Sequence, residues 1–134
     1  MQKDIDRPEV KDIAVAIVKE KNEKEEDLWN VYLLNLKKEK IENVLVTSRG
    51  YGSLKGEDVK TSTLRHFLDS IEPMSFAKIE PIIENLFGIS NEFWVSFYVK
   101  KTIYDKKYVF LAESIRKEHL VDIPLIGKKG VMIR

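Results

Sequence analysis

The sequence predicts an all-β protein: an immunoglobulin-like antiparallel β-sandwich of about seven strands, with a short helical turn and a docked C-terminal tail, in a single domain over residues 1–134. Two observations support this fold class. Apolar and polar side chains alternate with a period of two in several short segments, and glycine, proline or charged residues separate those segments. The cysteine–tryptophan–cysteine pattern of true immunoglobulin domains is absent, because the chain contains no cysteine.

The clearest alternation lies in Phe93–Leu111. Apolar side chains occupy every second position from Phe93 to Val99, which is the rhythm of a strand with one buried face. A polar turn follows, and then a second run of residues that favour strands, so the segment predicts a hairpin. We expect the apolar face of its first strand to form the floor of the core.

Three more strands are predicted in the N-terminal part of the chain, at Val10–Lys19, Leu28–Leu36 and Ile41–Ser48. The charge run Glu20–Asp27 is interpreted as an exposed loop, and Lys37–Lys40 as a turn. In the first strand, one face carries large aliphatic residues and the other carries small ones. The small side chains indicate that another part of the chain packs closely on that second face.

The middle of the chain is harder to assign. Arg49–Lys60 contains three of the six glycines, and we expect it to be a mobile loop. The apolar residues of Thr61–Ile71 have helical spacing but also fit a short strand at Thr63–Leu68. We predict the strand, because strands flank it and threonine favours extended backbone. Ser75–Ile83 is predicted as a strand at a sheet edge, since Pro81 cannot donate a ladder hydrogen bond.

The remaining segments complete the predicted domain. Glu84–Asn91 is a connection that buries Leu86 or Phe87, and Glu113–Leu120 forms a short helical turn. The tail Val121–Arg134 is too rich in large aliphatic residues to stay in solvent, so we expect it to dock on the domain. The predicted core residues are Ile13, Val15, Ile17, Trp29, Val31, Leu33, Val44, Val46, Phe93, Val95, Phe97 and Phe110.

Composition indicates a soluble globular protein. Of the 134 residues, 43% are apolar and 34% are charged, and a domain of this size can bury a core without disulfides. The absence of cysteine excludes disulfides and thiolate zinc sites and fits a reducing compartment. Met1–Val10 lacks the apolar region of a signal peptide, and no apolar run approaches the roughly 18 residues of a membrane helix. We therefore expect a cytoplasmic protein with no membrane partner.

The net charge of +1 does not itself select a partner, but the basic residues are unevenly distributed. In the C-terminal part they concentrate in three turns, as Lys100-Lys101, Lys106-Lys107 and Lys128-Lys129. Such lysines are typical of solvated turns and of positions that protect strand edges from aggregation. The alternative is a surface that faces a polyanion.

No motif predicts catalysis, a metal site or a cofactor. The two histidines are not spaced as metal ligands, and we expect His66 to be half-buried and His119 to lie on the surface. No serine lies in a Gly-x-Ser-x-Gly elbow, and Gly50-Tyr51-Gly52 lacks the remaining residues of a phosphate loop. Paired acids for general acid–base chemistry cannot be selected among 22 Asp and Glu residues. The sequence therefore favours a protein that is not an enzyme.

The central hairpin carries an aromatic and basic surface. Trp94 and Tyr98 lie on the side opposite the predicted core, and Lys100 follows them along the chain. If exposed, these residues form a stacking platform with a cation, suited to nucleic-acid bases or an aromatic ligand. The alternative, which the sequence favours, is that the C-terminal tail covers them, since the tail lacks a partner and this face lacks a cover.

Four further candidate binding residues are Arg49, Tyr51, Arg65 and His66. The first three line a neighbouring surface if the glycine-rich loop folds back.

Several segments resemble a family of short uncharacterised bacterial proteins. The resemblance covers nearly the whole chain and is carried by Asp4–Val15, Val44–Tyr51, Thr61–His66, Ser75–Glu80 and Asp122–Val131. Some members are labelled phenylalanyl-tRNA synthetase alpha subunit, without the catalytic motifs of that enzyme, whose catalytic domain is far longer. The resemblance implies no catalytic residues here, and at most an RNA-related accessory role.

Three functions fit the sequence. The preferred one is a non-enzymatic module that binds a protein partner through an edge strand or a loop rim, and an exposed edge also allows a homodimer. The second is an RNA- or tRNA-associated accessory module that uses the aromatic–basic surface. The third is a small-molecule site between the sheets or under the glycine-rich loop. The first is preferred because no catalytic constellation accompanies a well-patterned β fold.

Overall fold

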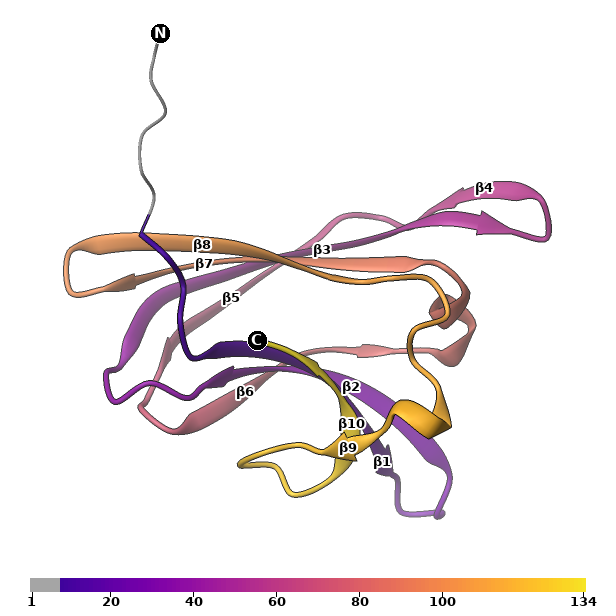
Figure 1. Ribbon diagram of the computed structural model, residues 1–134, viewed down its shortest axis with the longest axis horizontal. Coiled ribbons are helices and arrows are strands. Elements are labelled where there is room, and N and C mark those ends of the chain that lie inside the picture. Colours follow the sequence, from indigo (N-terminus) through magenta and orange to yellow (C-terminus); the bar gives the residue numbers. More distant parts are fainter. Residues whose placement is uncertain (1–7) are drawn as a thin grey trace, which may run out of the picture.

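The segments with period-two patterning fold as strands in the computed structural model, which describes residues 8–134 (Figure 1). Met1–Arg7 lie outside that range. The expectation that Met1–Val10 is not a signal peptide therefore concerns mostly residues outside the described part of the chain. The described residues form ten strands and two 3₁₀ helices, three strands more than predicted. The elements are β1 (Ile13–Lys21), β2 (Asp27–Asn35), β3 (Ile41–Leu54), β4 (Glu57–Lys60), β5 (Leu64–Ile71), β6 (Ser75–Ile82), η1 (Glu84–Gly88), β7 (Ser90–Val99), β8 (Thr102–Phe110), η2 (Lys117–His119), β9 (Val121–Asp122) and β10 (Lys129–Ile133).

The strands form two antiparallel sheets packed face to face, so the prediction of a β-sandwich is confirmed (Figure 1). Sheet A has the strand order β6-β2-β1-β10-β9. Sheet B has the order β4-β3-β7-β8, and β5 also pairs with β3, beside its first half, whereas β4 pairs with its end. Among the described residues, no helix has the length and apolar character needed to cross a membrane.

The core lies between the two sheets, where the inward rows of β1 and β2 meet those of β3 and β7. Every predicted core residue is buried, and the most exposed of them, Trp29, shows 8% of its surface. The sequence analysis missed Tyr108 on β8, which is 1% exposed. Its hydroxyl donates a 2.6 Å hydrogen bond to the backbone oxygen of Ile13, so this side chain ties sheet B to the start of sheet A. Burial raises the pKa of Tyr108, which keeps the hydroxyl protonated as a donor.

The expectation of a mobile loop at Arg49–Lys60 is wrong. β3 continues through this segment to Leu54, turns at Lys55 and Gly56, and returns as β4. Both turn residues have positive φ, 53° and 82°, which is the geometry of a tight two-residue hairpin. The high glycine content of this segment indicated flexibility, but Gly56 provides the positive φ that the β3–β4 turn requires.

The other uncertain segments follow the predictions. Thr61–Ile71 contains a strand, β5, and β6 lies at the edge of sheet A with Pro81 near its end. The 3₁₀ helix η1 follows, and Leu86 and Phe87 in it are partly buried against the core. The segment Glu113–Leu120 contains the single turn η2.

The C-terminal tail docks, as predicted, by adding β10 to the edge of β1. The connection between β9 and β10 then folds over the outer face of sheet A. There Ile123, 1% exposed, packs with Ala14, Ala16 and Val18 of β1 in a second, smaller apolar cluster. The small residues of β1 therefore have the close neighbour that their size indicated.

A charged cluster fastens this connection. Lys128 donates a 2.6 Å hydrogen bond to Glu20 at the end of β1, and Asn30 and Tyr32 of β2 donate to the same carboxylate at 2.6 and 2.8 Å. Burial alone would raise the pKa of Glu20, but these hydrogen bonds and the Lys128 charge outweigh it and hold the pKa below its usual value of 4.5. Burial and the Glu20 carboxylate raise the pKa of Tyr32 to about 12.

Replacing Tyr108 with Phe removes the hydrogen bond between the sheets and leaves the Ile13 oxygen buried without a donor. We expect the free energy of unfolding to fall by about 1 kcal/mol, measured by urea denaturation. Tyr104→Phe is the matched control, since Tyr104 lies on the same strand and its hydroxyl has no hydrogen bond to the described residues. Equal stability of the two variants would contradict the assigned role of Tyr108.

Replacing Glu20 with Gln weakens the fastening of the β9–β10 connection. Because the folded-state pKa of Glu20 is lowered, its contribution is fully present above the unfolded-state pKa and is lost as pH falls through the folded-state pKa. We expect the variant to be less stable by about 1 kcal/mol at neutral pH, with the gap closing as pH falls through the lowered folded-state pKa of Glu20. Thermal unfolding as a function of pH measures this, and the exposed Glu118→Gln serves as control. A gap that does not change with pH would exclude the proposed ionic contribution.

Candidate functional site

The outer face of sheet B carries a strip of exposed apolar and aromatic side chains. They lie on neighbouring strands: Leu45 of β3 is opposite Phe67 of β5, and Tyr98 of β7 is opposite Ile103 of β8. Trp94 lies on the same outward row of β7. We call this set the outer strip; its exposed fractions are 37% for Leu45, 60% for Phe67, 46% for Trp94, 36% for Tyr98 and 51% for Ile103.

The expectation that the C-terminal tail covers Trp94 and Tyr98 is therefore wrong. The tail finds its partner in β1 of sheet A, on the other side of the sandwich. The edge of β1 has backbone groups that need partners, and β10 supplies their hydrogen bonds. The outward face of sheet B has no such groups, because its strands already pair with one another. The aromatic residues of β7 stay accessible.

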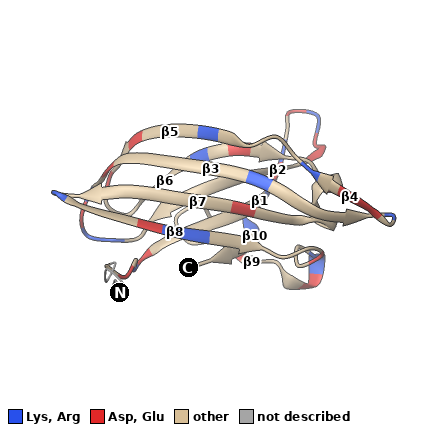
Figure 2. Cartoon of the chain, turned by 90° about the horizontal axis from the view of Figure 1, so that it is seen from above, with Lys and Arg blue, Asp and Glu red and all other residues tan. Residues whose placement is uncertain are grey.

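Charged residues gather at one end of the strip, around Glu92 of β7. Its side chain is only 6% exposed, because Arg49, Tyr51 and Lys107 close around it. The Arg49 Nε donates to Glu92 at 3.1 Å, the Tyr51 hydroxyl donates at 3.3 Å, and the Lys107 ammonium lies 4.0 Å away. Figure 2 shows basic residues on β3 and β8 flanking the acidic residue of β7.

The two cations also contact aromatic rings. The Arg49 guanidinium lies 5.4 Å from the ring centre of Tyr51, and the Lys107 ammonium lies 5.2 Å from that of Trp94. The Lys107 ammonium therefore occupies one side of the Trp94 ring.

The structure brings only some of the predicted binding residues together. Arg49, Tyr51 and Trp94 form one continuous surface with Arg65, which faces outward from β5 opposite Thr47. Lys100 lies in the β7–β8 turn rather than on the strip. His66 points to the other side of β5 and is half-buried, as expected, and His119 is exposed.

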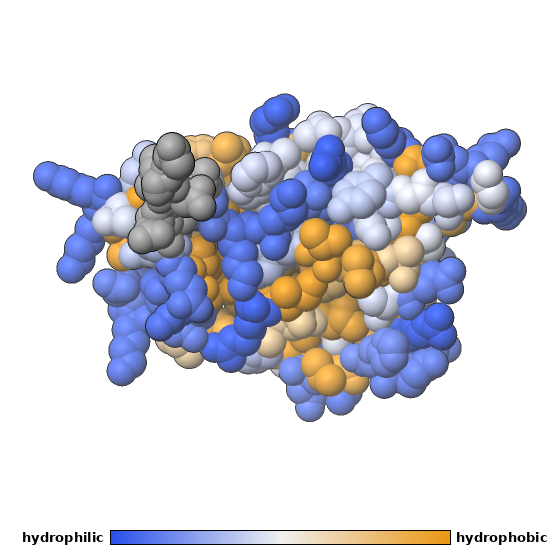
Figure 3. Space-filling view, turned by 45° about the horizontal axis from the view of Figure 1, so that its top comes forward, coloured by the Kyte–Doolittle hydropathy of each residue, from blue (hydrophilic) through white to orange (hydrophobic). Residues whose placement is uncertain are grey.

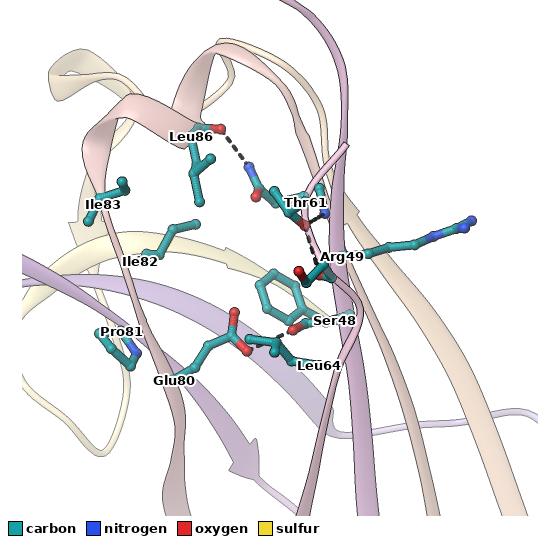
Figure 4. A pocket seen from close by; sticks show the side chains of 13 residues that line it. Ser48, Arg49, Thr61, Leu64, Glu80, Pro81, Ile82, Ile83 and Leu86 are labelled. Carbon is teal, nitrogen blue, oxygen red and sulfur yellow. Dashed lines mark hydrogen bonds between the residues drawn. The ribbon is translucent and has the colours of Figure 1, made fainter. Parts of the chain in front are cut away.

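A cleft of about 320 Å³ opens between the two sheets, where the β4–β5 connection faces the end of β6 (Figure 4). Gly50 forms part of its floor, and a side-chain carbon there would lie 2.9 Å from Ile89 and 3.0 Å from Thr61. Thr61 is tied to this position, since its hydroxyl accepts a 2.7 Å hydrogen bond from the Gly50 N–H. The apolar side chains that line the cleft are Leu64, Pro81, Ile82, Ile83, Leu86 and Phe93.

Glu80 lies at the polar end of this cleft, with its side chain 15% exposed. One of its oxygens, Oε1, accepts hydrogen bonds from the Ser48 hydroxyl at 2.7 Å and contacts His66 Nε2 at 2.6 Å. A β-bulge explains its direction: β6 pairs Glu80 with Val31 but Lys78 with Tyr32, so Ile79 is an extra residue. The bulge turns Glu80 toward the space between the sheets, where strict alternation would place it on the solvent side.

These three residues differ in arrangement from a serine nucleophile with its base. In that arrangement an imidazole contacts the serine and a carboxylate orients the imidazole. Here the carboxylate lies between the other two groups and accepts from both. Ser48 and His66 therefore hold Glu80 in place, and the described residues leave its second oxygen, Oε2, without a donor.

Other surfaces offer less chemistry. A hydrophobic area lies where the end of β8 faces β10 (Figure 3), and Val109, Leu111, Val131 and Ile133 are among the residues that line a shallow hollow there. Within residues 8–134, no group of three or more His, Asp or Glu side chains could hold a metal ion.

Sequence reasoning missed Glu92, Lys107, Phe67 and Leu45 on the outer face, and Glu80 in the cleft. The alternation of β7 places Glu92 two residues before Trp94 on the same face, so that pairing could have been inferred. The inward position of Glu80 depends on the bulge in β6, and no pattern in the sequence predicts that bulge. No protein-family model, curated protein or solved structure matches this chain.

The protein has two tryptophans in opposite environments, which allows a direct test of the strip. Trp29 is buried and donates a 3.0 Å hydrogen bond to Glu84, whereas Trp94 is 46% exposed. We expect acrylamide to quench the fluorescence of Trp29→Phe, which retains Trp94, several times more strongly than that of Trp94→Phe. Similar quenching of both variants would show that Trp94 is covered.

Proposed function

We propose that this protein is a non-enzymatic interaction module that binds a protein partner through the outer strip of sheet B. The observation that carries the proposal is the strip itself: large apolar side chains are exposed on adjacent strands, beside Arg49, Arg65 and Lys107. Contiguous exposed apolar surface is a feature of interaction sites. Tryptophan, tyrosine and arginine are also the residues that contribute most to binding at such sites.

The face of sheet B suits a partner better than the strand edges that the sequence suggested. Two of the edge strands are protected: β6 contains Pro81, and β8 carries Lys106 and Lys107, which lie within the strand and not in the turn expected from the sequence. Proline and lysine at edges oppose the addition of a further strand. A partner that presents apolar side chains flanked by carboxylates complements the strip and its basic end.

The alternative is an RNA- or tRNA-associated accessory role, in line with the family resemblance. It is favoured by the grouping of Trp94, Arg49, Arg65 and Lys107 on one surface. Three features make it second choice. Lys107 already occupies one side of the Trp94 ring, and Glu92 neutralises part of the positive charge. Trp94 and Tyr98 are also about 13 Å apart along the strand, too far to hold one base between them.

Substitutions in the strip test the proposal. The double variant Phe67→Glu/Trp94→Glu places charges at the centre of the surface, and we expect it to lose the proteins that the wild-type chain captures from host lysate. Val121→Glu is the matched control, since Val121 is 52% exposed and lies in sheet A. If a second copy is the partner, a concentration-dependent dimer should disappear in the double variant only.

Three results would count against this function. If the double variant and the wild type capture the same proteins, the outer strip is not the binding surface. Quenching of Trp94 by single-stranded RNA at low salt, weakening steeply as salt rises, would favour the RNA alternative. Turnover of a defined substrate that one substitution abolishes would identify an enzyme.

We also propose that the sandwich is of the immunoglobulin type and that the protein is bacterial and cytoplasmic. β2 pairs with β6, β3 with β7 and β7 with β8, which corresponds to the pairing of strands B with E, C with F and F with G. β1 and β5 then take the places of strands A and C′, and β4, β9 and β10 are additions. The absence of cysteine supports a reducing compartment.

A further inference from the structure

We propose that the cleft between the sheets is a binding site for a small molecule that carries one protonated amine on an apolar body. The site is independent of the outer strip, and its occupancy does not require a protein partner. The proposal rests on three features: the volume and lining of the cleft, the partly buried carboxylate at one end of it, and the bulge that directs this carboxylate inward.

The volume and the apolar lining of the cleft indicate the size and the apolar character of the ligand. Its volume of about 320 Å³ is at the small end of the range typical of ligand pockets. Ile82 and Phe93 form buried walls, at 6% and 1% exposed. Leu64 and Ile83 form the rim, and they are 47% and 64% exposed, so an apolar body that enters the cleft covers surface now in contact with water.

The carboxylate of Glu80 determines the charge of the ligand. Ser48 and His66 both engage Oε1, and in Figure 4 the second oxygen points into the cleft, on the side of Ile82. An ionised carboxylate accepts hydrogen bonds and donates none, so a group that binds Oε2 must be a donor. A protonated amine supplies donors and a positive charge, and both gain strength where water is partly excluded.

The cationic residue among those that line the cleft, Arg49, does not pair with Glu80. Arg49 contributes its backbone to the cleft, but its side chain points away in Figure 4 and pairs with Glu92 on the outer face. His66 meets Glu80 from β5, on the oxygen that Ser48 also uses. The remaining polar groups of the lining are the side chains of Ser62, Thr61 and Asn91, which carry no charge.

The bulge in β6 makes this arrangement a built feature of the fold. Turning Glu80 inward places a carboxylate next to the core, which is costly unless a partner compensates it. Ser48, at 3% exposed, and His66 compensate one oxygen. β-Bulges that redirect a side chain are frequent next to binding sites.

Matched small ligands test the proposal on the wild-type protein. Amide chemical shifts are followed by NMR during titration with hexylamine at pH 7, and separately with hexan-1-ol and hexanoate, which have the same apolar body. We expect hexylamine to bind at least about tenfold more tightly than the alcohol, with hexanoate weakest, because only the amine gains the ionic hydrogen bond. The shifted amides should be those of cleft residues such as Gly50, Thr61, Ile82 and Asn91.

Two variants test whether the Glu80 carboxylate is the group that selects the amine. Glu80→Gln keeps the size of the side chain and removes its charge, so the preference for the amine over the alcohol should disappear. Glu57→Gln, on the exposed β4, should retain it. Equal affinity for amine and alcohol, shifts that map outside the cleft, absence of binding, or an unchanged preference in a folded Glu80→Gln would each overturn the proposal. The wild-type comparison decides it even if the Glu80 variant does not fold.

Discussion

The burial of the inward side chains of β3 and β7 against those of β1 and β2 is the interaction on which the rest of the structure depends. These four strands supply most of the core, and each has neighbours in its own sheet that complete its hydrogen bonds. Burying alternate side chains has a second effect, because the residues between them must face outward. The exposure of Trp94 and Tyr98 is thus the counterpart of the burial of Phe93, Val95 and Phe97.

The outer faces of sheet A and sheet B differ in how far the rest of the chain covers them. The outer face of sheet A receives the β9–β10 connection, which covers the small side chains of β1 and is fastened through Glu20. The outer face of sheet B receives no such cover and keeps large aromatic and aliphatic side chains in solvent. One layer is covered in part by the chain itself, and the other leaves its large apolar side chains exposed. That asymmetry is the physical basis of the proposed interaction.

The centre of the core was predictable, since alternation and side-chain size identify the inward residues of β1, β2 and β7. Core residues on the flanking strands, such as Ile71, Ile79 and Tyr108, were not predicted. The candidate sites were less predictable, for two physical reasons. Glycine content indicated flexibility in Arg49–Lys60, but Gly50 is required by the close approach of Ile89 and Gly56 by a turn with positive φ. The inward direction of Glu80 arises from one extra residue in β6, and a shift of one position reverses the face of every side chain beyond it.

The pairing of β10 with β1 joins segments from opposite ends of the sequence, with Gly130 beside Val18. β1 leaves the ribosome about 110 residues before β10, so its second hydrogen-bonding partner is missing when it first emerges. Until then one side of β1 remains an open template for other nascent chains. Contacts this distant in sequence are also slow to form. Sheet A is therefore completed only after β10 has been synthesised, and until then the unpaired side of β1 is a site at which incomplete chains can associate.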